Sequence, residues 1–529
     1  MGVTSNTARP PAARGQSQSA IIWREFRKRH LAVAAAAVIL LLMTTSIFAP
    51  LLANDAPIYY FGFNRFEYQE ASRNLRAMGK QIIEARSKPD SAGSVERLQN
   101  AIPLQIEIMS RALPPEKTGP LQETGRKLLA AAKSSEPASV DEMNQLLRTI
   151  RTEYDVKEVT LKAESHWPIF AKLNALDIAF MLGDLLFLLF PLWNMVIGRL
   201  VAEGQGNRRA WYQFIILVAL PVGAGLIWWS TVPSRVDRTE YKKKGVLAAN
   251  DEGNQADAVF QSVVWPLVAY GVDEHELAEK PIPPVIYPQA KDAPPFKPST
   301  PWSGQHWLGT DKLGRDVLCR MIWGGRVSLS VGLVAVTIYV AIGIVVGAIA
   351  GYFRGICDLV ISRLIEVMIC FPTFFLILTI VAFFGPSVLN IMVIIGLTGW
   401  TGIARLVRGE FLRLVDQEFV LAGRALGYSP ARLIFRHILP NALAPVLVSA
   451  TFGIAGGILT ESALSFLGLG VSKPTPSWGS LLYDGRDSME HAPWLIHFPG
   501  LAIFIVITAY NLMGEALRDA SDPRMRGIR

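Results

Sequence analysis

The chain has 529 residues, of which 51% are hydrophobic and 18% are charged, and its formal net charge is +8. This composition is typical of a membrane protein and argues against one large soluble core. The positive charge lies mostly in loops that flank apolar runs, which fits the positive-inside rule and makes nucleic acid a poor explanation for it. The three cysteines, Cys319, Cys357 and Cys370, indicate neither a disulfide framework nor a metal site.

The N-terminal region predicts a membrane anchor. Residues 1–30 read as a cytoplasmic tail that ends in the basic cluster WREFRKRH (23–30). The apolar run 31–53 follows directly, and it is too long for the hydrophobic region of a signal peptide. We therefore expect a first transmembrane helix whose N-terminus faces the cytoplasm.

A long polar insertion follows the anchor. Residues 54–172 carry apolar residues at helical spacing, and Ser139 with Glu142 has the spacing of a capping box. These patterns predict a helical domain outside the membrane. Basic residues within it do not violate the charge rule, because long domains are translocated largely regardless of charge.

Residues 173–232 predict an extra transmembrane hairpin, with apolar runs at 174–198 and 211–232. The connector between them contains Arg199, Arg208 and Arg209, which places it in the cytoplasm. Asp177 and Asp184 lie seven residues apart, on one face of the first helix. They could hydrogen-bond across a helix interface or handle a proton or substrate. Residues 233–324 predict a second outer segment, rich in proline and more extended than helical.

Residues 325–529 predict the transmembrane core, with five further apolar runs at 327–352, 364–384, 387–404, 443–467 and 495–514. Pro372 interrupts the second of these runs and predicts a kink. Placing 354–363 and 405–436 inside and 468–491 outside satisfies the charge rule and puts both termini in the cytoplasm. We therefore expect an all-α membrane protein with about eight transmembrane helices.

A polar, basic stretch at 405–441 interrupts the core, and residues 418–441 read as two short helices joined at a corner. The first ends at Gly427, the residue type best suited to a left-handed C-cap. Ser429 is placed to cap the second helix, with Pro430 at its first position and Pro440 ending it. The first helix carries small residues that would let another protein approach its backbone: Ala422, Gly423, Ala425 and Gly427.

This elbow resembles the "EAA" loop of ABC importer permeases, which docks onto the ATP-hydrolysing subunit. Three other blocks resemble signatures of the dipeptide/oligopeptide/nickel permease family, in the family's order: 309–329 (GTDKLGRDVLCRMIWGGRVSL), 459–487 and 514–524. The resemblance covers roughly residues 309–523 and implies a six-helix core to which the extra hairpin is added. One departure is that Leu421 stands where the family has an acidic residue, and Gly423 replaces its second alanine.

The resemblance also implies the functional residues. The expected contacts with the ATPase are Glu418, Ala422, Gly423, Arg424, Ala425, Gly427, Arg432 and Pro440. The arginines could equally determine topology at membrane ends. The candidate gate or pathway residues are Asp311, Arg315, Asp316 and Glu461, although capping or local ion pairing would explain the first three as well.

The chain contains no phosphate-binding GxxxxGK[ST] motif, no HExxH and no G-x-S-x-G, so we expect no enzyme, cofactor or metal site. The resemblance implies a permease of an ATP-driven importer in the bacterial cytoplasmic (inner) membrane, working by alternating access. Its partners would be a second permease subunit, two ABC ATPase subunits, an extracytoplasmic substrate-binding protein and membrane lipid. Its substrate would be a peptide, a nickel chelate or another small solute. A transport-derived sensor or scaffold remains an alternative, whereas the elbow disfavours a secondary carrier.

Overall fold

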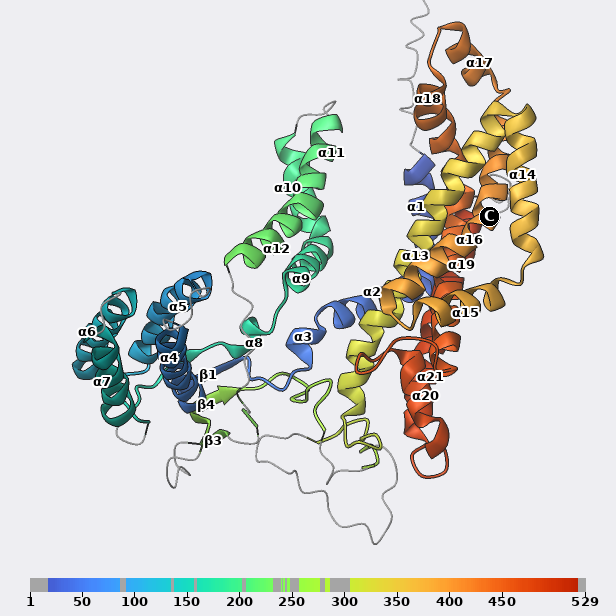
Figure 1. The fold of residues 1–529 in the computed structure, drawn as a ribbon. Helices are drawn as coiled ribbons and strands as arrows, with labels where there is room; N and C mark the ends of the chain where they lie inside the picture. The colour runs from blue at the N-terminus through green and yellow to red at the C-terminus, as the bar shows by residue number, and fades with distance from the viewer. Residues whose placement is uncertain are drawn as a thin grey trace, which may run out of the picture.

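The computed structural model describes residues 18–85, 92–134, 138–156, 159–201, 206–231, 239, 241–242, 245–247, 256–275, 281–285 and 305–521. The tail up to residue 17, part of the connector 199–210, most of the proline-rich stretch 281–302 and the end of the third signature lie outside these residues. The described chain is mostly helical, as predicted. It comprises a long helical bundle, a helical hairpin and an inserted domain, which lies beyond the end of the hairpin that begins at residue 173 (Figure 1).

The bundle is formed by helices from the N-terminal part and the C-terminal half of the chain. They are α1 (Gln18–Arg27), α2 (His30–Ile47), α3 (Ala49–Leu52), α13 (Val317–Phe353), α14 (Gly355–Cys370), α15 (Thr373–Phe384), α16 (Val388–Leu414), α19 (Leu439–Phe466) and α21 (Trp494–Ser521). A shorter helix, α20 (Trp478–Gly485), precedes a 3-10 turn (Arg486–Ser488) and packs against α19 and α21.

Small residues allow α13 and α16 to pack closely along their length. Gly343, Gly347 and Gly351 form a stripe at four-residue spacing on α13. A Cβ atom added at Gly347 would stand 2.5 Å from the carbonyl oxygen of Ala404, so no larger residue fits there without moving the helices apart. Such stripes are common between membrane helices, where close backbone approach provides much of the packing energy.

The first and the last helix of the described chain meet on one side of the bundle. Phe26 of α1 and Ala516 of α21 are buried in one cluster, and Arg29 contacts Asp519 at 2.7 Å. The start and the end of the described chain therefore lie on the same side of the bundle.

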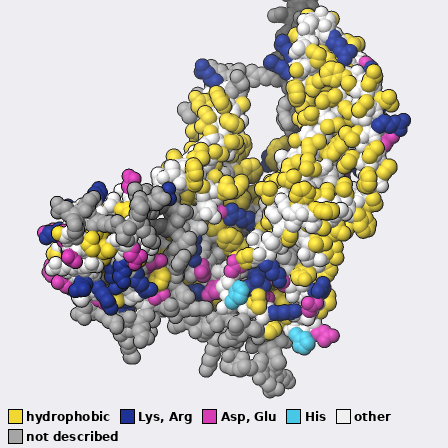
Figure 2. All heavy atoms as spheres, in the orientation of Figure 1, with side chains coloured by type: hydrophobic (Ala, Val, Ile, Leu, Met, Phe, Trp, Pro, Cys, Tyr) yellow, Lys and Arg dark blue, Asp and Glu magenta, His cyan; other side chains and the backbone are white. Residues whose placement is uncertain are grey.

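Six helical stretches are long and apolar enough to cross a membrane, and the number rises to eight if each of two bent helix pairs is one span. One bent pair is α14 and α15, which meet at 80°. Pro372 lies at that bend, which confirms the predicted kink, because proline lacks the N–H group and keeps Phe371 extended. Apolar side chains cover the visible sides of the bundle and the hairpin (Figure 2).

The extra hairpin consists of α9 (Ala175–Leu188), α10 (Phe190–Leu200), α11 (Gly206–Phe214), a π-helical turn (Ile215–Ala219) and α12 (Leu220–Thr231). Its first arm is the second bent pair, with 66° between α9 and α10. The end of α10 and the start of α11 point towards the same end of the molecule as the elbow (Figure 1).

The inserted domain has a core of its own, formed by α4 (Arg65–Ala85), α5 (Ala92–Arg111), α6 (Pro115–Lys133) and α7 (Ala138–Glu153). Leu75, Leu128 and Ile150 are fully buried in it, in line with the helical spacing of the sequence. Ser139, the expected cap of the last helix, lies within α7 and is buried.

The sequence did not predict a four-stranded sheet, which joins the inserted domain to the second outer segment. Its strands are β1 (Tyr59–Asn64), β2 (Glu164–His166), β3 (Gly245–Leu247) and β4 (Ala258–Val264), in the order β2-β1-β4-β3. β1 pairs antiparallel with β2 and β4, and β3 pairs parallel with β4. The short helix α8 (Pro168–Ala171) leads from the sheet to the hairpin.

Candidate functional site

The elbow begins with α17 (Glu418–Ala425), which ends in a Schellman motif. The N–H of Tyr428 donates to the carbonyl of Gly423 at 3.0 Å, and the N–H of Gly427 donates to that of Arg424 at 2.9 Å. Gly427 has φ +74°, the left-handed conformation that closes this motif. The predicted C-cap is therefore confirmed. Nothing lies within 4 Å of a Cβ built there, so only the backbone conformation requires glycine.

The second helix begins as predicted but continues further. Ser429 accepts a hydrogen bond from the N–H of Arg432, and Pro430 opens α18 (Pro430–Arg432). The prediction that Pro440 ends this helix was wrong, because one helical stretch runs from Pro430 to Phe466. A π-helical segment (Leu433–Ile438) precedes Pro440, and this change of hydrogen-bond register accommodates the missing N–H group.

The inner face of the elbow packs onto the bundle. Val420 and Leu433 are buried with Phe411 of α16 in one cluster. Gly423 also faces inward, and a Cβ atom there would stand 2.8 Å from a Leu433 methyl group. The structure therefore places Gly423 between the two elbow helices and not on the outer surface that the sequence suggested.

The outer face of the elbow is exposed and largely apolar. Four large apolar side chains are exposed on it: Phe419, Leu421, Leu426 and Phe435. The expected contact residues Glu418, Ala422, Arg424, Ala425, Gly427, Arg432 and Pro440 are also exposed. Leu421, which departs from the acidic residue of the family pattern, is thus one of four exposed apolar side chains of the elbow.

Cation–π contacts and ion pairs hold the elbow and the neighbouring loop in place. The guanidinium of Arg432 lies 4.0 Å from the ring centre of Tyr428, and that of Arg424 lies 5.4 Å from Tyr352 at the end of α13. Deeper in the bundle, Arg408 of α16 binds Asp358 of α14 with both nitrogen donors, one of them at 2.8 Å. A movement of the elbow would therefore be transmitted to several helices.

At the opposite end of the bundle, the signature before α13 forms a buried charge cluster. Asp311 binds Arg315 at 2.7 Å, and Arg315 also reaches Asp484 of α20 at 3.1 Å. Arg320 and Lys473 contact the same Asp484 at 3.3 and 2.8 Å. Arg320 is 2% exposed, and its Nε and Nη1 find no hydrogen-bond partner within the described residues. These contacts favour ion pairing over a docking surface, because Asp311 and Arg315 are buried.

Asp316 caps α13, which the sequence had offered as one of two explanations. Its carboxylate accepts from the N–H of Cys319 at 2.6 Å and lies 2.8 Å from Nδ1 of His306. His306 stacks on Tyr270 with ring centres 4.3 Å apart. The cap is therefore buried beneath the second outer segment.

Glu461 is fully buried between α13, α19 and α20. Its carboxyl group accepts hydrogen bonds from Ser328 at 3.0 Å and Ser465 at 2.7 Å. Ser328 also accepts from the N–H of Trp478, which links the cluster to the first turn of α20. This polar cluster joins three helices, and within the described residues no cationic side chain hydrogen-bonds to Glu461.

The two acids of the hairpin differ in their surroundings. Asp177 is buried and forms an ion pair with Arg326 of α13, while also capping α9 through the N–H of Asn174. Asp184 faces Thr44 of α2, but its Oδ2 atom completes no hydrogen bond within the described residues. Asp177 thus hydrogen-bonds across a helix interface, as one of the two sequence interpretations held.

Several residues of these sites were missed by sequence reasoning. Asp484 lies within the second signature, but nothing in its spacing pointed to Arg315 or Arg320, 169 and 164 residues away. The serines around Glu461 likewise carry no pattern of their own. No group of three or more potential metal ligands was found in the described part of the chain.

Comparison with known proteins gives consistent matches. Residues 343–527 match the family described as binding-protein-dependent transport system inner membrane component, and residues 17–73 match the N-terminal transmembrane domain of oligopeptide transport permease C. The dipeptide transport system permease protein of Alkalihalophilus pseudofirmus is 44% identical over 42% of this chain and 74% of its own length. The glutathione transport system permease protein of Pectobacterium atrosepticum is 39% identical over 42% and 74%.

A solved structure, an inward-facing conformation of the MetNI methionine ABC transporter, matches with a TM-score of 0.31 and 17% identity, over 38% of this chain and 95% of that chain. Residues 74–342 fall between the two family matches. Most of the inserted domain, the extra hairpin and the second outer segment lie in this interval.

Proposed function

Since the chain belongs to the family of binding-protein-dependent transport system inner membrane components, we propose that it carries short peptides through the membrane. It is the permease component of a bacterial ABC importer, and ATP hydrolysis belongs to a partner subunit. The names of the relatives support peptides as the substrate, including glutathione, which is itself a small peptide.

The observation that carries the coupling role is the exposed apolar face of the elbow. The large apolar side chains of Phe419, Leu421, Leu426 and Phe435 are all exposed on the elbow, and exposed apolar surface of this kind marks interaction sites. The charged residues Glu418, Arg424 and Arg432 are also exposed on the elbow. We assign this face to an ATPase subunit, with a second permease subunit completing a transporter that has two ATPases.

The mechanism we propose is alternating access. ATP binding closes the two ATPases, and their movement pushes the elbow. The elbow shares its buried core with α16 and continues directly into α19, so the push reaches the helices that carry the Glu461 cluster. That cluster and the Asp484 cluster would hold the outer end of the path closed until α13, α19 and α20 move apart.

In this proposal the elbow, both ends of the chain and the hairpin connector face the cytoplasm. The inserted domain and the sheet then stand outside, on the side from which a substrate-binding protein delivers its cargo. The Arg29–Asp519 contact supports a common side for the two ends.

Uptake by the reconstituted transporter tests the function. Proteoliposomes containing this chain, its second permease and its ATPases should accumulate a labelled dipeptide when ATP and the binding protein are supplied. Transport of a nickel chelate but of no peptide would overturn the substrate assignment. ATPase activity that does not respond to the loaded binding protein, with no uptake of any solute, would favour a sensor or scaffold instead.

A further inference from the structure

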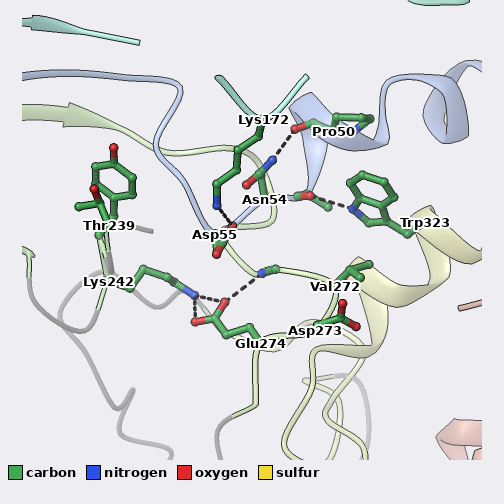
Figure 3. A pocket seen from close by; sticks show the side chains of 13 residues that line it. Pro50, Asn54, Asp55, Lys172, Thr239, Lys242, Val272, Asp273, Glu274 and Trp323 are labelled. Atoms are coloured by element: carbon green, nitrogen blue, oxygen red, sulfur yellow. Dashed lines mark hydrogen bonds and ion pairs between the residues drawn. The ribbon is translucent and has the colours of Figure 1, made fainter. Parts of the chain in front are cut away.

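A charged cleft of about 560 Å³ lies where the inserted part of the chain meets the bundle (Figure 3). Its walls come from the end of α3, the start of the hairpin, residues 239, 241 and 242 after the hairpin, the loop after β4, and Trp323 of α13. This volume lies within the range of small-molecule sites. Three carboxylates and two ammonium groups line it: Asp55, Asp273, Glu274, Lys172 and Lys242.

The two ion pairs in this cleft differ in accessibility. Lys242 is 4% exposed and holds Glu274 at 2.9 Å, and Glu274 also accepts from the N–H of Gly271. That pair is part of the local structure. Lys172 and Asp55 lie 2.5 Å apart with side chains 26% and 47% exposed. Exposed pairs of this kind contribute little to stability, so a charged ligand can replace either partner at small cost.

A second cavity of about 440 Å³ adjoins the cleft and shares Thr239 and Tyr241 with it. Thr239 is held there by the side-chain amide of Asn64 at 3.3 Å. Aromatic and aliphatic side chains form much of the lining: Tyr60, Phe66, Leu104, Ile108, Trp167 and Tyr241. Glu67 and Glu70 line it as well.

The linings of the two cavities together carry a net negative charge. Five carboxylates face two ammonium groups, which gives a net charge of −3, since burial lowers the pKa of His166 and favours its neutral form. The whole chain carries +8, so this acidity is local. Aromatic walls beside carboxylates suit a long cationic side chain, because its stem packs on the rings while its charge meets the acids.

We propose that the two adjoining cavities bind a short peptide with a basic side chain. Its amino terminus pairs with Asp55, its carboxylate pairs with Lys172, and its lysine or arginine side chain reaches the aromatic cavity near Glu70. This inference rests on the proposed peptide import, and it adds a selective site built by the insertion on the route to the core. The site favours basic peptides over acidic ones.

Calorimetry on the full-length chain in nanodiscs, without ATPases or binding protein, tests the site. The probes are glycyl-lysine, the uncharged analogue glycyl-norleucine and glycyl-glutamate. Glycyl-lysine should bind about tenfold more tightly than glycyl-norleucine, and glycyl-glutamate should bind most weakly. Equal affinity for glycyl-lysine and glycyl-glutamate, or no binding of glycyl-lysine up to the millimolar range, would overturn the proposal.

Variants separate the two halves of the site. Asp55→Asn should weaken all three peptides, whereas Glu70→Gln should weaken glycyl-lysine about tenfold and leave glycyl-norleucine unchanged. Glu123→Gln is the matched control, because Glu123 belongs to an exposed ion pair with Lys127 on α6, away from both cavities. If Glu70→Gln and Glu123→Gln bind glycyl-lysine equally well, the side-chain assignment is wrong. Peptide uptake that persists without binding here would refute this site alone, whereas absent uptake with intact binding would refute the import function.

Discussion

Asp177 of α9 is paired with Arg326 of α13, and this ion pair joins the extra hairpin to the bundle. Arg326 also lies 5.9 Å from the ring centre of Trp323, whose indole N–H donates to the carbonyl of Ala53. The pair therefore connects the hairpin, the chain at the end of α3 and α13 at one point. A buried carboxylate at such a place needs its cation, because an unpaired charge is costly in an apolar environment.

Removing the cation should loosen the hairpin. Cysteines at Thr44 and Asp184, which face each other, should form a disulfide-length cross-link in the native background and react more slowly in Arg326→Met. The exchanged pair Asp177→Arg with Arg326→Asp should restore part of the rate. Lys162→Met is the control, since Lys162 forms an exposed pair with Glu164. Unchanged cross-linking in Arg326→Met would show that the ion pair does not hold the hairpin.

Substitutions at Gly427, the C-cap residue of the elbow, should reduce ATPase coupling in a graded way. A residue with a side chain costs about 1 kcal/mol or more at φ +74°, and β-branched residues cost most. Gly427→Asn should keep most ATPase coupling, and Gly427→Val should abolish ATP-dependent uptake while the protein still inserts. Gly402→Val, at a helical position with open space around it, is the control. Wild-type uptake and ATPase stimulation by Gly427→Val would remove the elbow from the coupling route.

The local features of this fold were predictable from the sequence because their causes lie within a few residues. Gly427 and Ser429 set the two elbow caps, and Pro372 sets a bend, through their own backbone and side-chain chemistry. Pro440 does not end its helix, because the π-helical segment before it changes the hydrogen-bond register, and no local sequence pattern predicts such a segment.

The remaining features depend on distant partners. β1 pairs with β4 across nearly two hundred residues. Their sequences, YYFGFN and AVFQSVV, do not alternate apolar with polar residues, so neither gave a clear strand signal. Asp484 and the serines around Glu461 became recognisable only once the helices that carry them were packed. The acidic cavities likewise combine residues from several segments, whose individual charges look like an ordinary solvated surface.

Topology can be checked by labelling. After Cys357 and Cys370, which are exposed, are replaced by serine, a cysteine at Glu123 should react with a membrane-impermeant reagent from the outside. A cysteine at Ser429 should react only from the inside. Glu123 suits this test better than Ser139, which is buried. Labelling of the Ser429 cysteine from outside would invert the proposed orientation.

Asp484 is the anion that the outer charge cluster shares, and its replacement should cause a large loss of stability. Asp484→Asn leaves Arg315 and Arg320 without their common carboxylate, and breaking a buried pair in this way costs about 3–5 kcal/mol. We expect a clear fall in the thermal midpoint of the full chain in nanodiscs. The control is Asp487→Asn, three residues after Asp484. Asp487 forms an exposed pair with Arg486, so its replacement should leave the midpoint unchanged. Equal midpoints for the two variants would mean that the cluster does not stabilise the outer end.

The sheet predicts a pH dependence that comes from His166. Its ring stacks on Tyr60 at 4.7 Å, and burial lowers the pKa of His166, an effect that nearby Glu164 partly opposes. A folded pKa below the ordinary value of about 6.5 means that its contribution to stability is present above that pH. The contribution is lost as the pH falls through the folded pKa, because the unfolded chain then binds the proton more readily.

The thermal midpoint should therefore fall between pH 7.5 and 5.5 by more in the native chain than in His166→Gln. His491→Gln, an exposed site outside the sheet, should follow the native chain. If the native chain and His166→Gln lose the same amount over this range, His166 is not the group responsible.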